Sequence, residues 1–237
     1  MSWARRCIKW EVPLFVVLAL ATTAMAAFFL IAEDVWERQA MPLDTLILNF
    51  LFGIRSPALT VLANVITAGG SVQFVAVAVV LAVVLGWRQH RIDVYALLAT
   101  VIGAAVLNQL LKLFFARPRP ILHPALVHAL GYSFPSGHSM AALSFYGILG
   151  YLAGRHLRPP LRYLIYFSTA LWILLVGLSR NYLGVHYPSD VIGAYAVTLP
   201  ILIAVIYAYR CATSDVLVGE HKPGTVPVPE HIPDQAR

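Results

Sequence analysis

The residues best suited to chemistry lie in three short polar clusters within residues 112–190, and long apolar stretches separate these clusters. They combine cations that bind phosphate, imidazoles that attack or donate a proton, and a carboxylate that orients an imidazole. The clusters are Lys112 to Pro120, Pro135 to His138, and Ser179 to Asp190. Phosphoryl transfer is therefore the first hypothesis for this sequence.

The third cluster pairs a histidine with a carboxylate. His186 and Asp190 are four residues apart, and the intervening Pro188 suits the first turn of a helix. Asp190 then reaches back to His186, sets its tautomer and leaves the other ring nitrogen free to act as the nucleophile. Arg180 precedes the pair and is expected to stabilise the phosphate oxygens as charge shifts.

The first two clusters supply the other predicted phosphate-binding groups. Lys112 offers a point charge, and Arg119, held between two prolines, offers a bidentate fork. Ser136 and Gly137 lie where a helix is expected to begin, and a helix N-terminus binds anions through its backbone N–H groups. His138 adjoins this anion site and is the expected general acid, which protonates the departing oxygen.

Each charged residue also has an ordinary structural explanation. Lys112 can snorkel to the membrane surface, Arg117 and Arg119 can bind lipid headgroups, and Asp190 can cap a helix. A charge at the bilayer centre costs on the order of 3 kcal/mol. A single shared site therefore explains these charged residues and the two histidines better than a separate structural role for each of them.

The composition is that of an integral membrane protein. The 237 residues are 59% hydrophobic and 12% charged, with a mean hydropathy of +0.75, whereas soluble domains carry about 25% charge. The net charge of +6 comes from short basic clusters at the ends of apolar stretches. Nucleic acid is therefore not an expected partner; the bilayer and a membrane lipid are, and the oligomeric state is left open.

The apolar stretches predict an all-α, polytopic membrane protein of about six spans. The predicted spans are residues 12–32, 72–87, 94–115, 138–154, 163–178 and 190–209. The first stretch also fits a cleaved signal peptide, because Ala24-Met25-Ala26 is typical of a cleavage site, but the apolar run continues past it. Residues 1–210 are expected to form one membrane-embedded domain, and residues 211–237 a mobile cytoplasmic tail.

The segment 33–71 is more polar than the spans. Leu46, Ile47, Phe50 and Leu51 share one face at helical spacing. This pattern predicts either an interfacial helix or an ordinary extramembrane helix packed on the bundle.

Basic residues in the short loops orient the chain. The N-terminus, the loops 88–91 and 155–162, and the start of the tail are basic and are predicted to face the cytoplasm. The three polar clusters then lie at the outer end of the bundle. Cys7 and Cys211 are expected to be free thiols on the cytoplasmic side.

In order and separation, the three clusters resemble the signature motifs of the type 2 phosphatidic acid phosphatase superfamily. The motifs are Lys-x6-Arg-Pro from Lys112, Pro-Ser-Gly-His from Pro135 and Ser-Arg-x5-His-x3-Asp from Ser179. The resemblance implies an all-α membrane phosphatase in which His186 forms a phosphohistidine oriented by Asp190, and His138 protonates the leaving group and then activates water. It implies that the phosphate is held by Lys112, Arg119, Ser136, Gly137 and Arg180.

The resemblance also implies that no metal or other cofactor is needed. The residues agree, because no carboxylate cluster near the motifs suits magnesium or zinc. Compact bacterial members of the superfamily imply a protein of the inner (plasma) membrane that hydrolyses undecaprenyl diphosphate first, with phosphatidylglycerophosphate or phosphatidate close behind. Residues 33–71 and 121–134 are expected to select the lipid tail.

Two functions from other classes stay open. A phosphotransferase would use the same phosphohistidine and pass the phosphate to a lipid or sugar instead of water. A bis-histidine haem protein would use His138 and His186, but haem gives no reason for the three cations. Vanadium haloperoxidases resemble the same motifs, and the predicted membrane spans argue against them.

Overall fold

A computed structural model describes residues 14–37, 41–88 and 90–219, and within these ranges every regular element is a helix. The all-α prediction is therefore confirmed for the described part of the chain. The helices are α2 (Leu14–Trp36), α3 (Pro42–Gly53), α4 (Pro57–Gly69), α5 (Val72–Gly86), α6 (Arg91–Phe115), α7 (Gly137–Gly154), α8 (Pro159–Tyr182) and α9 (Pro188–Gly219).

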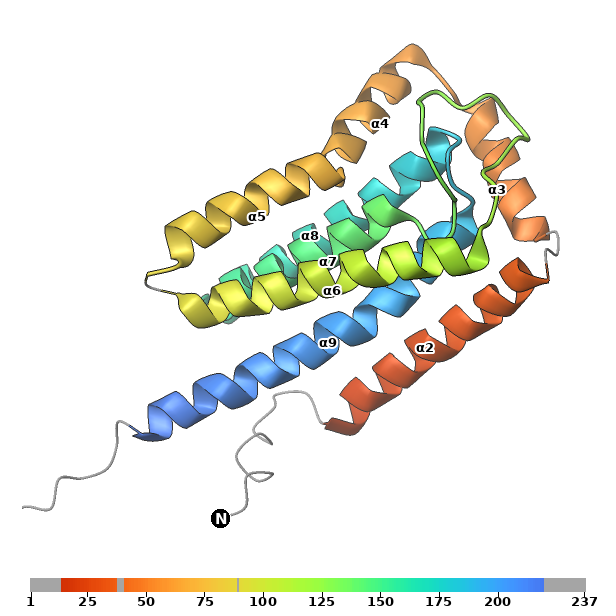
Figure 1. Cartoon of the computed structure of the whole chain (residues 1–237). Helices are drawn as coiled ribbons and strands as arrows, with labels where there is room; N and C mark the ends of the chain where they lie inside the picture. Colours follow the sequence, from red (N-terminus) through yellow and green to blue (C-terminus); the bar gives the residue numbers. More distant parts are fainter. Residues whose placement is uncertain (1–13, 38–40, 89, 220–237) are drawn as a thin grey trace, which may run out of the picture.

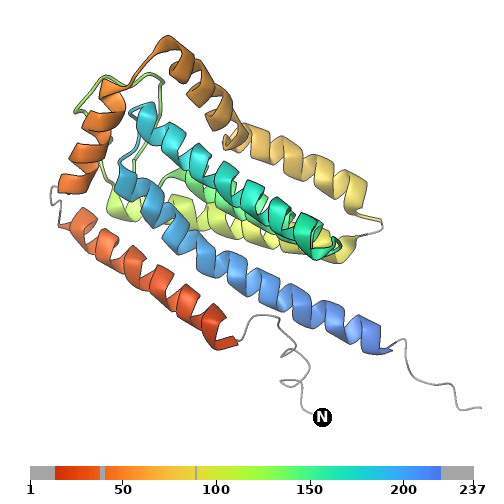
Figure 2. The same ribbon diagram turned by 180° about the vertical axis from the view of Figure 1, so that it is seen from behind.

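The long helices pack side by side around α7 (Figures 1 and 2). Helix α7 contacts α6, α8 and α9, and its Met140 and Ile148 are almost fully buried. Helix α2 packs on α9. The outer helices instead expose large apolar side chains, such as Leu85 (80% exposed) and Leu113 (71%). An apolar exterior around a buried central helix is what a bundle in lipid requires.

Four of the described helical segments are long and apolar enough to cross a membrane: α2, α6, α8 and residues Pro188–Thr213 of α9. Helices α4 and α5 together make a fifth candidate that is bent by 41°. Helix α7, predicted as the span 138–154, is not among them, because it holds His138, two serines and four glycines, which lower its hydropathy. The protein is thus an integral membrane protein with four or five candidate spans, and six spans stay a prediction.

The bend between α4 and α5 follows from the sequence. Ser56 caps α4 by accepting from the N–H of Leu59, and Ser71 caps α5 by accepting from the N–H of Phe74. Gly70 lies between the two helices, and a Cβ added there would lie 2.3 Å from Cγ1 of Val176 in α8. A glycine is therefore needed for the chain to turn this close to α8.

Helix α3 packs across the ends of α8 and α9 (Figure 1). Leu48 and Leu51 are buried, whereas Leu46 and Phe50 are each 65% exposed. The face expected from the sequence is therefore divided between the bundle and the exterior. Packing on the bundle fits the second of the two alternatives, and an interfacial position stays a prediction.

The C-terminal helix is longer than predicted. Helix α9 runs to Gly219, beyond the expected end of the span at residue 209. Residues 220–237, which make up most of the predicted mobile tail, lie outside the described residues, as do residues 1–13.

The prediction of a free thiol is wrong for Cys211, which is buried in α9 and disulfide-bonded. That prediction rested on an assumed reducing compartment, whereas the folded geometry decides whether a cysteine pairs. Cys7 lies outside the described residues.

Candidate active site

The predicted histidine–carboxylate pair lies at the turn between α8 and α9. His186 Nδ1 is 3.2 Å from Oδ2 of Asp190, and the two residues are 2% and 0% exposed. The N–H of Tyr187 donates to the same carboxylate oxygen at 2.8 Å. Asp190 lies in the first turn of α9, so the spacing of four residues places its carboxylate next to Nδ1 of the imidazole, as the sequence predicts.

The other ring nitrogen of His186 faces Arg119. Arg119 Nη1 is 3.3 Å from Nε2 of His186 and donates to the carbonyl of Val185 at 2.8 Å. Arg119 also donates to the carbonyls of Leu130 and Gly131, so several partners hold its guanidinium in place. When Nδ1–H donates to the Asp190 carboxylate, Nε2 carries the lone pair, and Nε2 is the nitrogen that faces the Arg119 cation.

Burial sets the charge of His186. It lowers the pKa of the imidazole from 6.5 to about 4, and the hydrogen bond to Asp190 acts in the opposite direction with a smaller effect. His186 is therefore neutral near pH 7, which is the state that a nucleophile needs.

Arg180 and Lys112 lie in the last turns of α8 and α6, near His186 and Asp190. Arg180, near the end of α8, is 5% exposed and donates from Nη1 to Oγ1 of Thr67 at 2.8 Å. Its Nε is buried and has no hydrogen-bond partner within the described part of the chain. Lys112, in the last turn of α6, donates from Nζ to the carbonyl of Tyr132. Helices α6 and α8 thus each place a cation at the end of the bundle that holds His186.

The second cluster forms the N-terminus of α7. Ser136 precedes this helix, is fully buried, and donates its N–H to the carbonyl of Asp190 at 3.1 Å. A Cβ added at Gly137 would lie 3.2 Å from Oδ1 of Asn108 and 3.9 Å from Cε of Lys112. The start of α7 is therefore in contact with both of the other clusters.

His138 lies in the first turn of α7. The residues close enough to interact with it electrostatically are Arg180, His186, Arg119 and Lys112. The structure thus brings together all eight residues that the sequence singles out for the site, at the end of the bundle where α3 lies.

Two residues of this region were missing from the predicted site. Arg117 donates from Nη1 to Oδ1 of Asp190 at 2.6 Å and from Nη2 to Oδ2 of Asp44 at 3.0 Å. The sequence places Arg117 in the first cluster only as a possible headgroup ligand. Asp44 is one carboxylate of an acidic stretch, and nothing in its local pattern links it to residues about 145 positions away.

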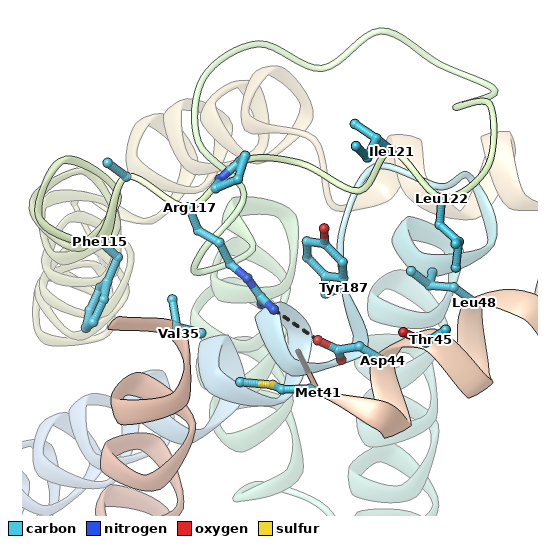
Figure 3. Close-up of a pocket in the computed structure, with 12 residues that line it drawn as sticks. Val35, Met41, Asp44, Thr45, Leu48, Phe115, Arg117, Ile121, Leu122 and Tyr187 are labelled. Carbon is cyan, nitrogen blue, oxygen red and sulfur yellow. Dashed lines mark hydrogen bonds and ion pairs between the residues drawn. The ribbon is translucent and has the colours of Figure 1, made fainter. Parts of the chain in front are cut away.

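A cavity of about 600 Å³ lies next to Asp44 and Arg117, between α2, α3 and the segment after α6 (Figure 3). Its walls are mainly apolar, and Asp44, Arg117 and Tyr187 supply polar groups. Neither His186 nor His138 lines it. The cavity therefore adjoins the site through Arg117 and Tyr187.

Metal-ligating side chains do not gather in groups of three or more anywhere among the described residues. The groups around His186 are mainly cations, which repel a metal ion. A reaction without metal or cofactor stays a prediction.

With the geometry in place, comparison with known proteins decides the family. Residues 93–214, more than half of the chain, match the family model described as the PAP2 superfamily. The chain belongs to the PAP2 superfamily. The matched segment contains all three predicted clusters, so the resemblance drawn from the motifs is confirmed, whereas α3 with Asp44 lies outside the match.

Curated relatives are named as phosphatases of lipid phosphates. The chain is 42% identical over 97 residues to phosphatidylglycerophosphatase B of Bacillus subtilis, covering 40% of this chain and 47% of the relative. It is 34% identical over 118 residues to undecaprenyl-diphosphatase BcrC of the same organism, covering 48% and 56%. It is 33% identical over 126 residues to lipid A 1-phosphatase of Rhizobium etli, covering 48% and 50%. The chain thus spans about half the length of these relatives.

Solved structures give a longer match. A transmembrane PAP2-type phosphatidylglycerolphosphate phosphatase from Bacillus subtilis superposes with a TM-score of 0.70 at 29% identity, covering 78% of this chain and 94% of that one. LpxE of Aquifex aeolicus superposes with a TM-score of 0.55 at 24% identity, covering 71% and 96%, and supports the fold alone.

Proposed function

We propose that this protein hydrolyses a lipid-linked phosphate or diphosphate through a phosphohistidine on His186. The observation that carries the proposal is the placement of His186, whose Nδ1 faces Asp190 while its Nε2 faces Arg119. A neutral, oriented imidazole beside a group of cations suits attack on phosphorus. The unpartnered Nε of Arg180 is a further donor that a phosphate oxygen would satisfy.

In the first half of the reaction, the lone pair on His186 Nε2 forms a bond to phosphorus, and the bond from phosphorus to the leaving oxygen breaks. Lys112, Arg119 and Arg180 stabilise the charge on the remaining oxygens. His138 gives its proton to the departing oxygen. The Asp190 carboxylate stabilises the positive charge that develops on the imidazole of His186.

In the second half, neutral His138 takes a proton from water while that water attacks phosphorus. The phosphorus–nitrogen bond then breaks, inorganic phosphate forms, and His186 returns to its neutral state. Burial of His138, and to a smaller extent three nearby cations, oppose its protonation. A phosphate bound among them offsets this effect, so we expect His138 to take up its proton together with the substrate.

The proposed substrates are undecaprenyl diphosphate and phosphatidylglycerophosphate, with phosphatidate as the third candidate. The resemblance to compact bacterial members of the superfamily favours the first of these, and the names of the relatives support both of the first two. We propose that the cavity of about 600 Å³ receives lipid next to the phosphate, because its walls are mainly apolar. Its lining comes largely from the two segments expected to select the tail, residues 33–71 and 121–134.

We place the protein in a bacterial inner membrane, with the site at the outer surface and both termini in the cytoplasm. The basic loops support this orientation, because they join helices at the end of the bundle opposite α3 (Figure 1). The disulfide at Cys211 stands against a cytoplasmic location for that end of α9, because the cytoplasm keeps thiols reduced.

The test is phosphate release by the detergent-purified protein, with EDTA present, from the three lipids side by side. His186→Ala is the control and should be inactive. A preference for the diphosphate would assign the protein to carrier-lipid recycling, and a preference for the other two lipids to phospholipid synthesis. No release from any of them, even with candidate phosphate acceptors added, would contradict the proposal.

A further inference from the structure

Asp44 is a buried carboxylate at the start of α3, outside the segment that the family model matches. It is 4% exposed. Its Oδ1 accepts the N–H of Ser189 at 2.8 Å, and its Oδ2 accepts Nη2 of Arg117 at 3.0 Å and the hydroxyl of Ser189. Figure 3 shows the ion pair between Asp44 and Arg117 among the residues that line the cavity. Both oxygens of this buried carboxylate accept hydrogen bonds, and these donors fix the side chain in place.

The same guanidinium also holds the catalytic carboxylate. Arg117 Nη1 donates to Oδ1 of Asp190 at 2.6 Å, and Oδ2 of Asp190 faces His186. Arg117 is itself mostly buried, and its guanidinium carbon lies 4.1 Å from the centroid of the Tyr187 ring. Asp44, Arg117, Asp190 and His186 therefore form one continuous chain of contacts, which we call the carboxylate relay.

The charges of the carboxylate relay do not cancel. Two carboxylates and one guanidinium leave a net charge of −1 next to neutral His186. A phosphohistidine and the transition state that leads to it place positive charge on the imidazole, and a preorganised negative charge stabilises that state. Without the Asp44 carboxylate, Arg117 would neutralise Asp190, and the imidazolium would lose this stabilisation.

We infer that Asp44 is a positioning residue for the reaction at His186: it orients Arg117 on Asp190 and keeps the carboxylate relay negative. This inference rests on the proposed phosphatase function. It makes α3, a helix that carries no motif residue, a part of the active site. The alternative is that Asp44 only fastens α3 to the start of α9, in which case its loss would lower stability without a specific effect on the transition state.

The test compares Asp44→Asn with a matched control, Asp93→Asn. Asp93 also pairs with an arginine, because Nη2 of Arg155 lies 3.0 Å from its Oδ2, and it also accepts from the hydroxyl of Tyr209. It lies in the first turn of α6, at the opposite end of the bundle from the site. For each variant, kcat and KM for the best lipid substrate are measured together with the thermal unfolding temperature.

A second readout separates the two roles without lipid turnover. Inorganic phosphate reports binding of the ground state, whereas orthovanadate, which can bond to an imidazole nitrogen in the geometry of the transition state, reports transition-state binding. Asp44→Asn should lower kcat by about tenfold to a hundredfold, the scale of an outer partner that orients a histidine. It should lower vanadate affinity in parallel and leave KM and phosphate affinity nearly unchanged. Asp93→Asn should leave all four quantities close to wild type.

The outcomes are distinct. If the wild type is active, three results would overturn the inference while leaving the proposed function in place. The first is an unchanged kcat in Asp44→Asn, and the second is an equal loss of kcat in Asp44→Asn and Asp93→Asn. The third is an equal loss of phosphate and vanadate affinity in Asp44→Asn. A wild type that neither hydrolyses the lipids nor binds phosphate would overturn the proposed function, and the inference with it. Should Asp44→Asn not fold, Arg117→Lys takes its place, because lysine keeps the charge but cannot bridge both carboxylates; wild-type kcat in that variant would overturn the inference.

Discussion

His186 is held from three directions before any substrate binds. Asp190 faces Nδ1, Arg119 faces Nε2, and Nδ2 of Asn181 donates to the backbone carbonyl of His186 at 3.0 Å. A buried ring with these partners has little freedom to rotate. The imidazole is therefore already oriented as a nucleophile requires, and such an orientation lowers the barrier to attack.

Asp190→Asn is expected to lower kcat strongly while the protein still folds. The amide no longer selects the tautomer of His186, and it no longer balances Arg117 or the imidazolium. A loss of about 10³ to 10⁴-fold is the scale seen when a carboxylate that orients a catalytic histidine becomes an amide. Phosphate release from the best lipid measures this loss. A change of less than about tenfold would show that Asp190 does not orient the nucleophile.

The lowered pKa of His186 predicts a pH dependence of stability. The pKa falls from 6.5 to about 4 on folding, so the unfolded chain binds a proton in this range and the folded protein does not. The stability that depends on neutral His186 is complete above pH 6.5 and is lost as the pH falls toward 4. The thermal unfolding temperature should therefore fall more for the wild type than for His186→Gln between neutral pH and about pH 5. Equal falls would contradict a buried, neutral imidazole.

At this scale the sequence predicts the residues within each motif but not their distant partners. Spacing along one helix turn is enough to pair His186 with Asp190. Thr67, which accepts from Arg180, and Asp44, which accepts from Arg117, lie on other helices. Their partners depend on how the helices pack, and local spacing carries no information about that.

Among the elements, the corner between α3 and α4 secures the turn that carries His186. Arg55 lies at this corner and donates from Nε and Nη2 to the carbonyl of Tyr182 at 3.3 and 3.0 Å, and from Nη1 to the carbonyl of Pro124 at 2.8 Å. One side chain thus ties together the corner, the end of α8 and the connection between α6 and α7.

Arg55→Ala is expected to destabilise the protein and to lower kcat, because the end of α8 loses a fixed partner four residues before His186. Leaving part-buried carbonyls without donors costs about 1–3 kcal/mol. Thermal unfolding and phosphate release measure the two effects. Arg158→Ala is the control, because Arg158 is the exposed N-cap residue of α8, and α8 begins at the end of the bundle opposite α3 (Figure 1). Equal effects in both variants would show that the corner has no specific role.

The helices themselves follow the sequence where they are uniformly apolar. α2, α5, α6 and α8 lie close to their predicted spans, and the double glycine before Ser71 marks a real break. Apolarity alone did not show that residues 57–69 form a helix leading into α5. It also did not show that α7 lies at the centre of the bundle, where contacts with neighbouring helices replace contacts with lipid.

For the whole molecule, the site and the basic loops lie at opposite ends of the bundle (Figure 2). This separation predicts which positions face the outside of the cell. In a background with Cys7→Ser and Cys211→Ser, Leu130→Cys should react with a membrane-impermeant maleimide on intact cells, because Leu130 is 95% exposed on the site's side. His156→Cys, in the loop between α7 and α8, should react only after permeabilisation. The reverse pattern would place the site in the cytoplasm.

The central claim is that His186 becomes covalently phosphorylated during turnover. The most direct measurement mixes the protein with lipid carrying labelled phosphate, quenches the reaction with alkali within the first turnover, and locates the label by peptide mapping. We expect an acid-labile, alkali-stable phosphate on the peptide that contains His186, and no such label in His186→Gln. Turnover without a labelled peptide, or a label that persists in His186→Gln, would contradict the account.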